Sequence, residues 1–172
     1  MLVHVQQVEI LLDDLQASAQ GELELKLIQQ LREWQGDYPL DSYLPTLFTE
    51  FSYQLLHASM ADELGETVFN NLLRTRMIDS TLPVLAADAD SAWWNNHNSG
   101  AAQSRQQVVA QAWQATLLHL RSTLGTQPKH WLWGKAHTLT HKHPLGHQSP
   151  LDSLLNIGNF AAPGGHEMPN NL

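Results

Sequence analysis

The sequence contains no cysteine and few basic residues. The lack of cysteine excludes disulfides, thiolate nucleophiles and cysteine-ligated zinc or iron–sulfur sites. Lys and Arg number 9 against 17 Asp and Glu, for a formal net charge of −8, and the cations are scattered along the chain. This distribution argues against a nucleic-acid-binding face and against binding to anionic membrane surfaces.

Long apolar runs are also missing. No stretch approaches the roughly 18 apolar residues of a membrane span, and residues 1–6 lack the basic start and apolar stretch of a signal peptide. The 172 residues are instead 42% hydrophobic and 15% charged, as expected for one folded domain or two small ones. Apolar periodicity begins at residue 2 or 3, and the chain stops without a charged tail, so we expect a piece cut from a larger chain.

Apolar residues recur at helical spacing through the first 125 residues. This pattern predicts about five helices, over residues 3–18, 22–34, 42–60, 62–77 and 101–124. Residues 78–90 are interpreted as a connection, and Gly125 as the C-cap that ends the last helix. Trp93 and Trp94 are neighbours and cannot share one face, so one of them should be buried.

The composition changes after Gly125, where Pro and Gly interrupt any sustained helical period. Residues 131–143, with alternating Thr138 and Thr140, favour a strand or an extended ribbon. Residues 151–157 fit one or two helical turns, and residues 158–165 an irregular segment laid against another element. The expected fold class is therefore mainly α, with a helical domain over 1–125 and an extended, partly β tail over 126–172 packing on it.

Histidine is concentrated in this tail. Five of the ten histidines fall within eighteen residues: His130, His137, His141, His143 and His147. His137 and His141 would share a helix face, His141 and His143 a strand face, and neutral imidazoles are good ligands for zinc or nickel. However, no acidic residue lies between Leu120 and Asp152. We therefore favour imidazoles of a half-buried ribbon that bond backbone groups over a metal site at His137, His141 and His143.

The sequence shows no self-contained catalytic set. There is no Gly-x-Ser-x-Gly motif, and Met1-Leu2 offers no N-terminal nucleophile. The pairs Asp13-Asp14 and Asp88-x-Asp90 are more typical of solvated surfaces than of catalysis. Gly164-Gly165 lacks the Lys and the following helix of a phosphate loop. We predict no catalytic residue, no metal and no cofactor in this chain.

Several motifs of the tail resemble the penicillin acylase (penicillin amidase) family, which shows a W-x-W-G-x-x-H, H-P-L-G, G-x-F and P-G-G pattern late in its β chain. The matching segments are Trp131-Leu132-Trp133-Gly134-Lys135-Ala136-His137, His143-Pro144-Leu145-Gly146, Gly158-Asn159-Phe160 and Pro163-Gly164-Gly165. Leu31-Arg32-Glu33-Trp34-Gln35-Gly36 is similar to the family's L-x-x-W-D-G, with Gln35 in place of Asp. The resemblance covers nearly the whole chain.

The resemblance implies a part of an N-terminal-nucleophile amide hydrolase, a fold with an αββα core and helical elaborations. Such proteins cleave themselves into α and β chains, are usually exported to the periplasm and often bind calcium. The family's nucleophile, oxyanion-hole Asn and calcium ligands precede the matched region, so none is carried over. The chain would then be an inert internal piece of the β chain. Its partners would be the rest of the α and β chains, and alone it would fold back on itself or dimerise.

A second hypothesis stays open from the residues alone. The chain would be a free-standing helical interaction module, in which the His-rich ribbon is a docking or metal-linked surface. Zinc binding discriminates the two, because stoichiometric binding with a rise in melting temperature favours the module. A metal-dependent enzyme is disfavoured, because no carboxylate lies near the histidines.

Overall fold

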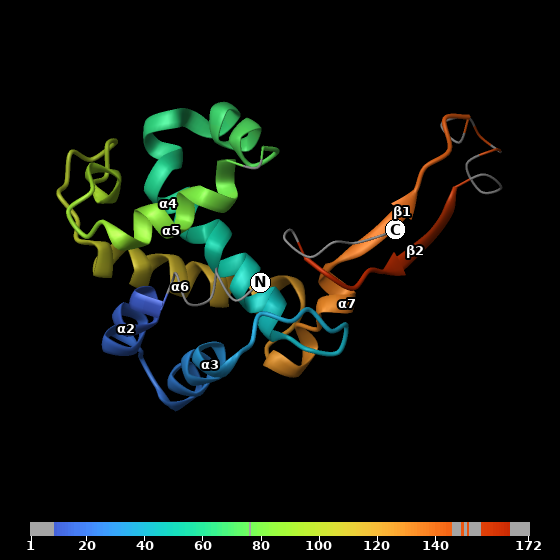
Figure 1. Ribbon diagram of the computed structural model, residues 1–172, viewed down its shortest axis with the longest axis horizontal. Coiled ribbons are helices and arrows are strands. Elements are labelled where there is room, and N and C mark those ends of the chain that lie inside the picture. Colours follow the sequence, from blue (N-terminus) through green and yellow to red (C-terminus); the bar gives the residue numbers. More distant parts are fainter. Residues whose placement is uncertain (1–8, 76, 146–148, 150, 152–155, 166–172) are drawn as a thin grey trace.

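The computed structural model describes residues 9–75, 77–145, 149, 151 and 156–165. Helices α2 to α6 form a helical body, and a two-stranded ribbon projects from it (Figure 1). This confirms a mainly α fold with a partly β tail. The elements are α2 (Glu9–Ser18), α3 (Glu22–Glu33), α4 (Leu44–Leu72), α5 (Met77–Ala87), η1 (Ala92–Trp94), α6 (Arg105–Thr123), η2 (Pro128–His130), α7 (Trp133–Ala136), β1 (Thr138–His141) and β2 (Ile157–Ala161).

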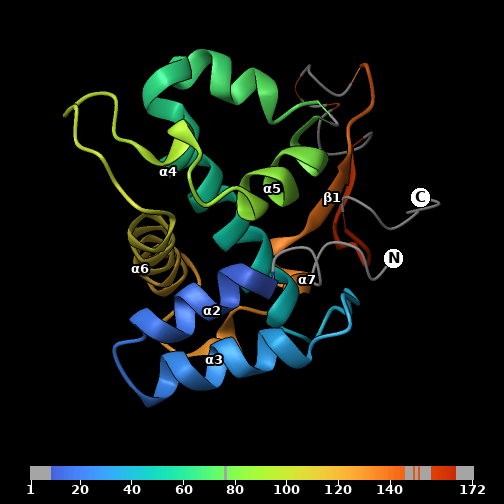
Figure 2. The same ribbon diagram turned by 60° about the vertical axis from the view of Figure 1, so that its left-hand side comes forward.

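The core of the body lies between α4, α6 and the pair α2–α3 (Figure 2). The predicted apolar stripe of α6 is confirmed, because Val109, Trp113, Leu117 and Leu120 are all buried. Burying each such side chain contributes on the order of 1.5–3 kcal/mol before the loss of conformational entropy. None of the described helices is long and apolar enough to cross a membrane.

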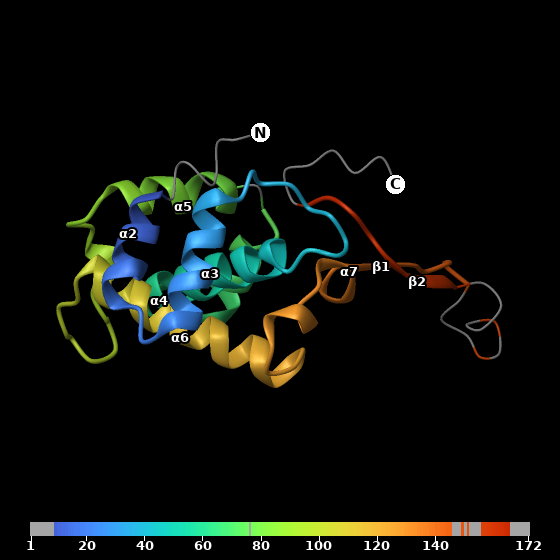
Figure 3. The same ribbon diagram turned by 90° about the horizontal axis from the view of Figure 1, so that it is seen from below.

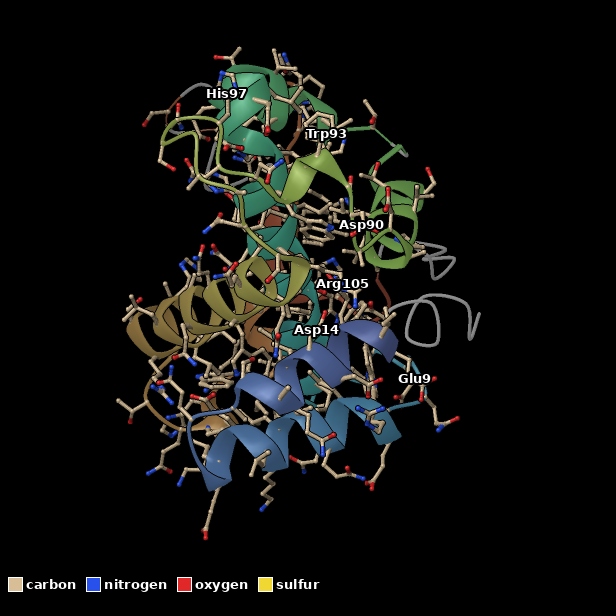
Figure 4. The ribbon with its side chains drawn as sticks, turned by 90° about the vertical axis from the view of Figure 1, so that its left-hand side faces the viewer. Glu9, Asp14, Asp90, Trp93, His97 and Arg105 are labelled. Atoms are coloured by element: carbon tan, nitrogen blue, oxygen red, sulfur yellow. The ribbon has the colours of Figure 1, made fainter. Side chains whose placement is uncertain are left out.

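An ion pair ties three helices together on one side of the core. Arg105 Nε, at the start of α6, donates to Asp14 Oδ2 of α2 at 2.7 Å, and Arg105 Nη1 donates to the carbonyl of Ala86 in α5 at 3.0 Å. Figure 4 shows Arg105 and Asp14 facing each other. Both side chains are largely buried, so the prediction of a solvated pair at Asp13-Asp14 is wrong for Asp14. Asp13 is exposed and bonds Arg32.

The start of α6 corrects the predicted boundary. The helix begins at Arg105, four residues after the predicted start at residue 101. Ser104 accepts the backbone N–H of Gln107, and the Gln107 side chain accepts that of Ser104, which forms a capping box. The Ser-x-x-Gln spacing is the signal that fixes this start. Gly125 has a φ of 117° and follows the end of the helix, as predicted.

The predicted helices over 42–60 and 62–77 both fall largely within α4, and the break between them lies at Gly65 rather than at residue 61. Gly65 has a φ of 72° and a ψ of 153°, which are open to glycine alone. After it the chain continues in helical conformation to Leu72.

The predicted connection over 78–90 is also wrong in part, since Met77–Ala87 is helix α5 despite Pro83. Leu82, Leu85 and Ala86 of this helix are buried. Packing of this apolar side therefore outweighs the local cost of the proline. Of the tryptophan pair that follows, Trp94 is 1% exposed and Trp93 36% exposed, so one of the two is buried, as predicted.

We predict that Gly65→Ala destabilises the chain by about 1–3 kcal/mol, the cost of forcing a side chain into this backbone conformation. No atom lies within 4 Å of an added Cβ at Gly65, so strain alone is tested. The control is Gly21→Ser at the N-cap of α3, where the backbone is extended and the space is equally open. Urea unfolding should show a lower free energy of unfolding for Gly65→Ala only. An equal decrease in both variants would contradict this explanation of the break.

Candidate functional site

The tail is joined to the body through the turn before α4. The backbone N–H of Trp133 donates to the carbonyl of Ser42 at 2.8 Å, and that of Gly134 to the carbonyl of Leu40 at 2.9 Å. A Cβ on Gly134 would lie 3.2 Å from both the Leu40 side chain and its carbonyl oxygen. The close approach of the two backbones therefore favours glycine at this position of the W-x-W-G motif.

The indole of Trp133 connects this junction with the end of β2. Its Nε1 donates to the carbonyl of Gly164 at 2.9 Å, and its ring meets Tyr38 edge-on at 5.2 Å between ring centroids. Tyr38 in turn contacts Trp34 of the body. A Cβ on Gly165 would lie 2.6 Å from the Tyr38 ring, so the chain after β2 passes against this aromatic cluster. We call the contact of Trp133, Gly134 and Gly164 with residues 38–42 the ribbon root.

His137 closes the root on its other side. Its ring stacks on Trp133 at 4.6 Å between centroids and 12° between planes, and its Nδ1 bonds the carbonyl of Ala162 at 2.7 Å. Because a carbonyl only accepts, Nδ1 carries a proton here. The backbone N–H of Ala162 donates back to the carbonyl of His137 at 3.0 Å. This is the backbone-bonded imidazole that the sequence analysis favoured.

The other two histidines of the metal hypothesis lie further out. His141 is exposed at the end of β1, and His143 is exposed beyond it. The Nδ1 of His143 accepts the backbone N–H of Leu145 at 3.2 Å. Across the described residues, no three His, Asp or Glu side chains come together as metal ligands; His147 lies outside these residues.

The ribbon is an antiparallel pair with a bulge. Leu139 lies opposite Phe160, and His141 lies opposite Ile157, so Gly158 and Asn159 together face one residue of β1. Gly158 has a φ of 72°, which suits the first residue of a glycine bulge. The bulge places the Leu139–Phe160 and His141–Ile157 pairs on one face of the ribbon, because side chains alternate along a strand.

The predicted strand over 131–143 is correct only for residues 138–141. Trp131 follows η2 and Trp133 begins the short helix α7. Their indoles bond the carbonyls of Gly125 and Gly164. Residues 158–161, predicted to be irregular, belong to β2. The predicted helical turns over 151–157 fall largely outside the described residues. The role of Tyr38, Leu40 and Ser42 in the root was missed. Tyr38 and Leu40 lie between two predicted helices, and Ser42 was expected to begin the second. The available signal was the aromatic side chain of Tyr38.

Two of the three buried hydroxyl groups in the described part of the body are used by its own helices, whereas that of Thr46 has no hydrogen-bond partner. Ser59 donates to the carbonyl of Leu55, and Thr116 to that of Ala112. Exposed Ser122 and Thr123 both donate to the carbonyl of His119 rather than to its ring. These hydroxyl groups lack the imidazole base that activates a serine or threonine nucleophile.

A second polar cluster holds the loop before α6. Asp62 Oδ2 accepts the backbone N–H of His97 at 2.6 Å, with His97 labelled in Figure 4. Burial raises the pKa of Asp62, but bonds from the Glu63 side chain and from backbone N–H groups outweigh it, so this pKa is lowered. Burial raises the pKa of Glu63, and the hydrogen bond and negative charge of Asp62 raise it further.

A groove of about 410 Å³ opens beside this cluster, between α4, α5 and η1. Trp93, Val84 and Leu85 supply its apolar lining, and Asp88 its charged group. Ser80, Thr81 and Ser91 add hydroxyl groups, and the described lining includes neither imidazole nor cation.

The carboxyl pair gives a testable pH dependence. Glu63→Gln should stabilise the chain at neutral pH, because it removes a negative charge beside Asp62. The gain should vanish as the pH falls through the raised pKa of Glu63, where the wild-type carboxyl is itself protonated. Urea unfolding from acidic to neutral pH measures this difference in the free energy of unfolding, with Glu22→Gln as the control. A difference of constant size at every pH would contradict the raised pKa of Glu63.

The indole bond of the root gives a second prediction. Trp133→Phe keeps a ring beside Tyr38 but leaves the Gly164 carbonyl without its donor, at a cost of about 1 kcal/mol. Amide exchange in β2 should become faster, because this bond holds the end of the strand. Trp93→Phe makes the same chemical change at an exposed site and should alter neither quantity. An unchanged exchange rate in the Trp133 variant would contradict the role of the root.

The comparisons with known proteins place these features in a family. Among curated proteins, no match is found. The family model described as penicillin amidase matches residues 2–172. The match includes the body, the root and the ribbon, in which the glycines and tryptophans of the motifs have the structural roles described above. The chain therefore belongs to the penicillin amidase family.

Proposed function

We propose that this chain is a packing part of a penicillin-amidase-type amidohydrolase and has no amidase activity alone. The observation that carries the proposal is the ribbon, which is joined to the body at its root while every residue of β2 is exposed. Ile157 is 61% exposed and Phe160 49% exposed. An isolated two-stranded ribbon is marginally stable in water. A partner that covers the ribbon would explain why it carries apolar side chains at Ile157 and Phe160.

The chemistry of the described residues supports the same proposal. The hydroxyl groups of Ser59, Thr116, Ser122 and Thr123 bond helix carbonyls, and the imidazole of His137 bonds the carbonyl of Ala162. These four hydroxyl groups and this imidazole are thus committed to structure. The nucleophile would come from the rest of the hydrolase.

Several further properties belong to the proposal through the family. The partners would be the remaining α and β chains, arranged as an αββα N-terminal-nucleophile hydrolase. The whole protein would act in the periplasm, and any calcium would be bound outside this chain. The helical body would cover one side of the hydrolase core and help to shape the substrate entrance.

An activity assay tests the proposal. The purified 172-residue chain, given a chromogenic phenylacetyl or fatty-acyl amide, should show no turnover above buffer, whereas the full-length hydrolase should cleave one of these substrates. Circular dichroism on the same sample verifies that the helices are folded. Turnover by the isolated chain at rates like those of the full-length protein would overturn the proposal.

The exposed histidines favour one alternative, an interaction module with a metal-binding ribbon. In our account His137 is held by Ala162 and Trp133, so zinc should not bind stoichiometrically at micromolar concentration or raise the melting temperature. Calorimetric titration of the wild type and of a His141→Ala/His143→Ala variant measures this. Tight binding that the double variant abolishes would favour the alternative.

A further inference from the structure

The two faces of the ribbon differ in chemistry. Leu139, Phe160 and Ile157 lie on one face together with His141, as the register requires. Thr138 and Thr140 lie on the other face. The ribbon extends away from the helical body (Figure 3), so the body does not cover the apolar face.

Charge is divided between the body and the tail. Residues 1–125 hold six Lys and Arg against fifteen Asp and Glu, whereas no carboxylate lies between Leu120 and Asp152. Lys135 and Lys142, at the two ends of the β1 segment, are exposed. The ion pairs among the described residues include neither lysine. The described residues of the ribbon thus offer positive charge around an apolar patch and carry no carboxylate.

We infer that the Leu139–Phe160–Ile157 face of the ribbon docks on the remainder of the hydrolase, at an apolar surface fringed by carboxylates. This inference rests on the proposed function. It specifies the face of the ribbon that is buried and the chemistry of the surface that it contacts. Ile157 and Phe160, 61% and 49% exposed, supply most of the affinity, because a partner would cover this surface. Lys135 and Lys142 select the acidic rim and disfavour a basic one. The Thr138–Thr140 face stays in water.

Hydrogen exchange in the full-length hydrolase tests which face is buried. Amides of β1 and β2 should exchange at least tenfold more slowly there than in the isolated chain. Ile157→Asn should remove that difference and, unlike Phe160→Asn, leaves the Phe160 ring over Gly158. The matched control is Thr138→Asn/Thr140→Asn, which places the same side chain on the other face and should change the rates less than twofold.

Two results would overturn the inference. One is equal or greater acceleration by the threonine variants; the other is ribbon exchange in the full-length protein as fast as in the isolated chain. Neither hydrogen-exchange readout uses activity. The inference can therefore fail although the isolated chain proves inert, and it can hold although the isolated chain proves active.

Carbodiimide cross-linking tests the acidic rim, because it joins a lysine Nζ to a carboxylate in direct contact. In the full-length hydrolase, Lys135 or Lys142 should link to Asp or Glu outside residues 1–172. Lys26, exposed on α3 of the acidic body, is the control and should link only within residues 1–125. Links from Lys135 and Lys142 confined to carboxylates of residues 1–125, in the same or a second copy, would overturn the inference, as would no link at all.

Discussion

The structure depends on one constraint, that a buried indole N–H needs an acceptor. Four tryptophans meet it with a backbone carbonyl outside a regular helix: Trp34 with Asp37, Trp94 with Asp88, Trp131 with Gly125, and Trp133 with Gly164. Each bond closes a loop that has little secondary structure of its own. Trp113, inside α6, is the exception: its buried Nε1 has no hydrogen-bond partner among the described residues, and its ring packs edge-on against Phe51. In the irregular half of the chain these side-chain bonds therefore add to the backbone bonds of the root, such as that from Trp133 N–H to the carbonyl of Ser42.

Of these four bonds, that of Trp133 links sequence to function most directly. It joins residues 31 positions apart, so the ribbon leaves the body and returns to it at one place. Tyr38 and the stacked His137 fill the space around the indole. Because its base is fixed to the body, the ribbon would present the proposed docking surface at a defined place, which lowers the ordering cost of binding.

The sequence predicted the body better than the tail, for a physical reason. Helical periodicity reports on one buried face, and it located α3 and the stripe of α6 well. It missed α5, where Pro83 masks a helix that packing stabilises, and it divided α4 before Gly65 because the break has no periodic signature. In the tail, composition suggested a strand for Trp131 and Trp133. Their true positions depend on acceptors at Gly125 and Gly164, and local sequence does not encode such contacts.

Solvent exchange measured by NMR on the isolated chain tests this account most directly, because it reads the root and the ribbon in one sample. The indole protons of Trp131 and Trp133 should exchange slowly, and that of the exposed Trp93 quickly. The amides of β2 should exchange far faster than those of α6, since all five residues of β2 are exposed. A ribbon as protected as α6, or a Trp133 indole as accessible as that of Trp93, would contradict the account.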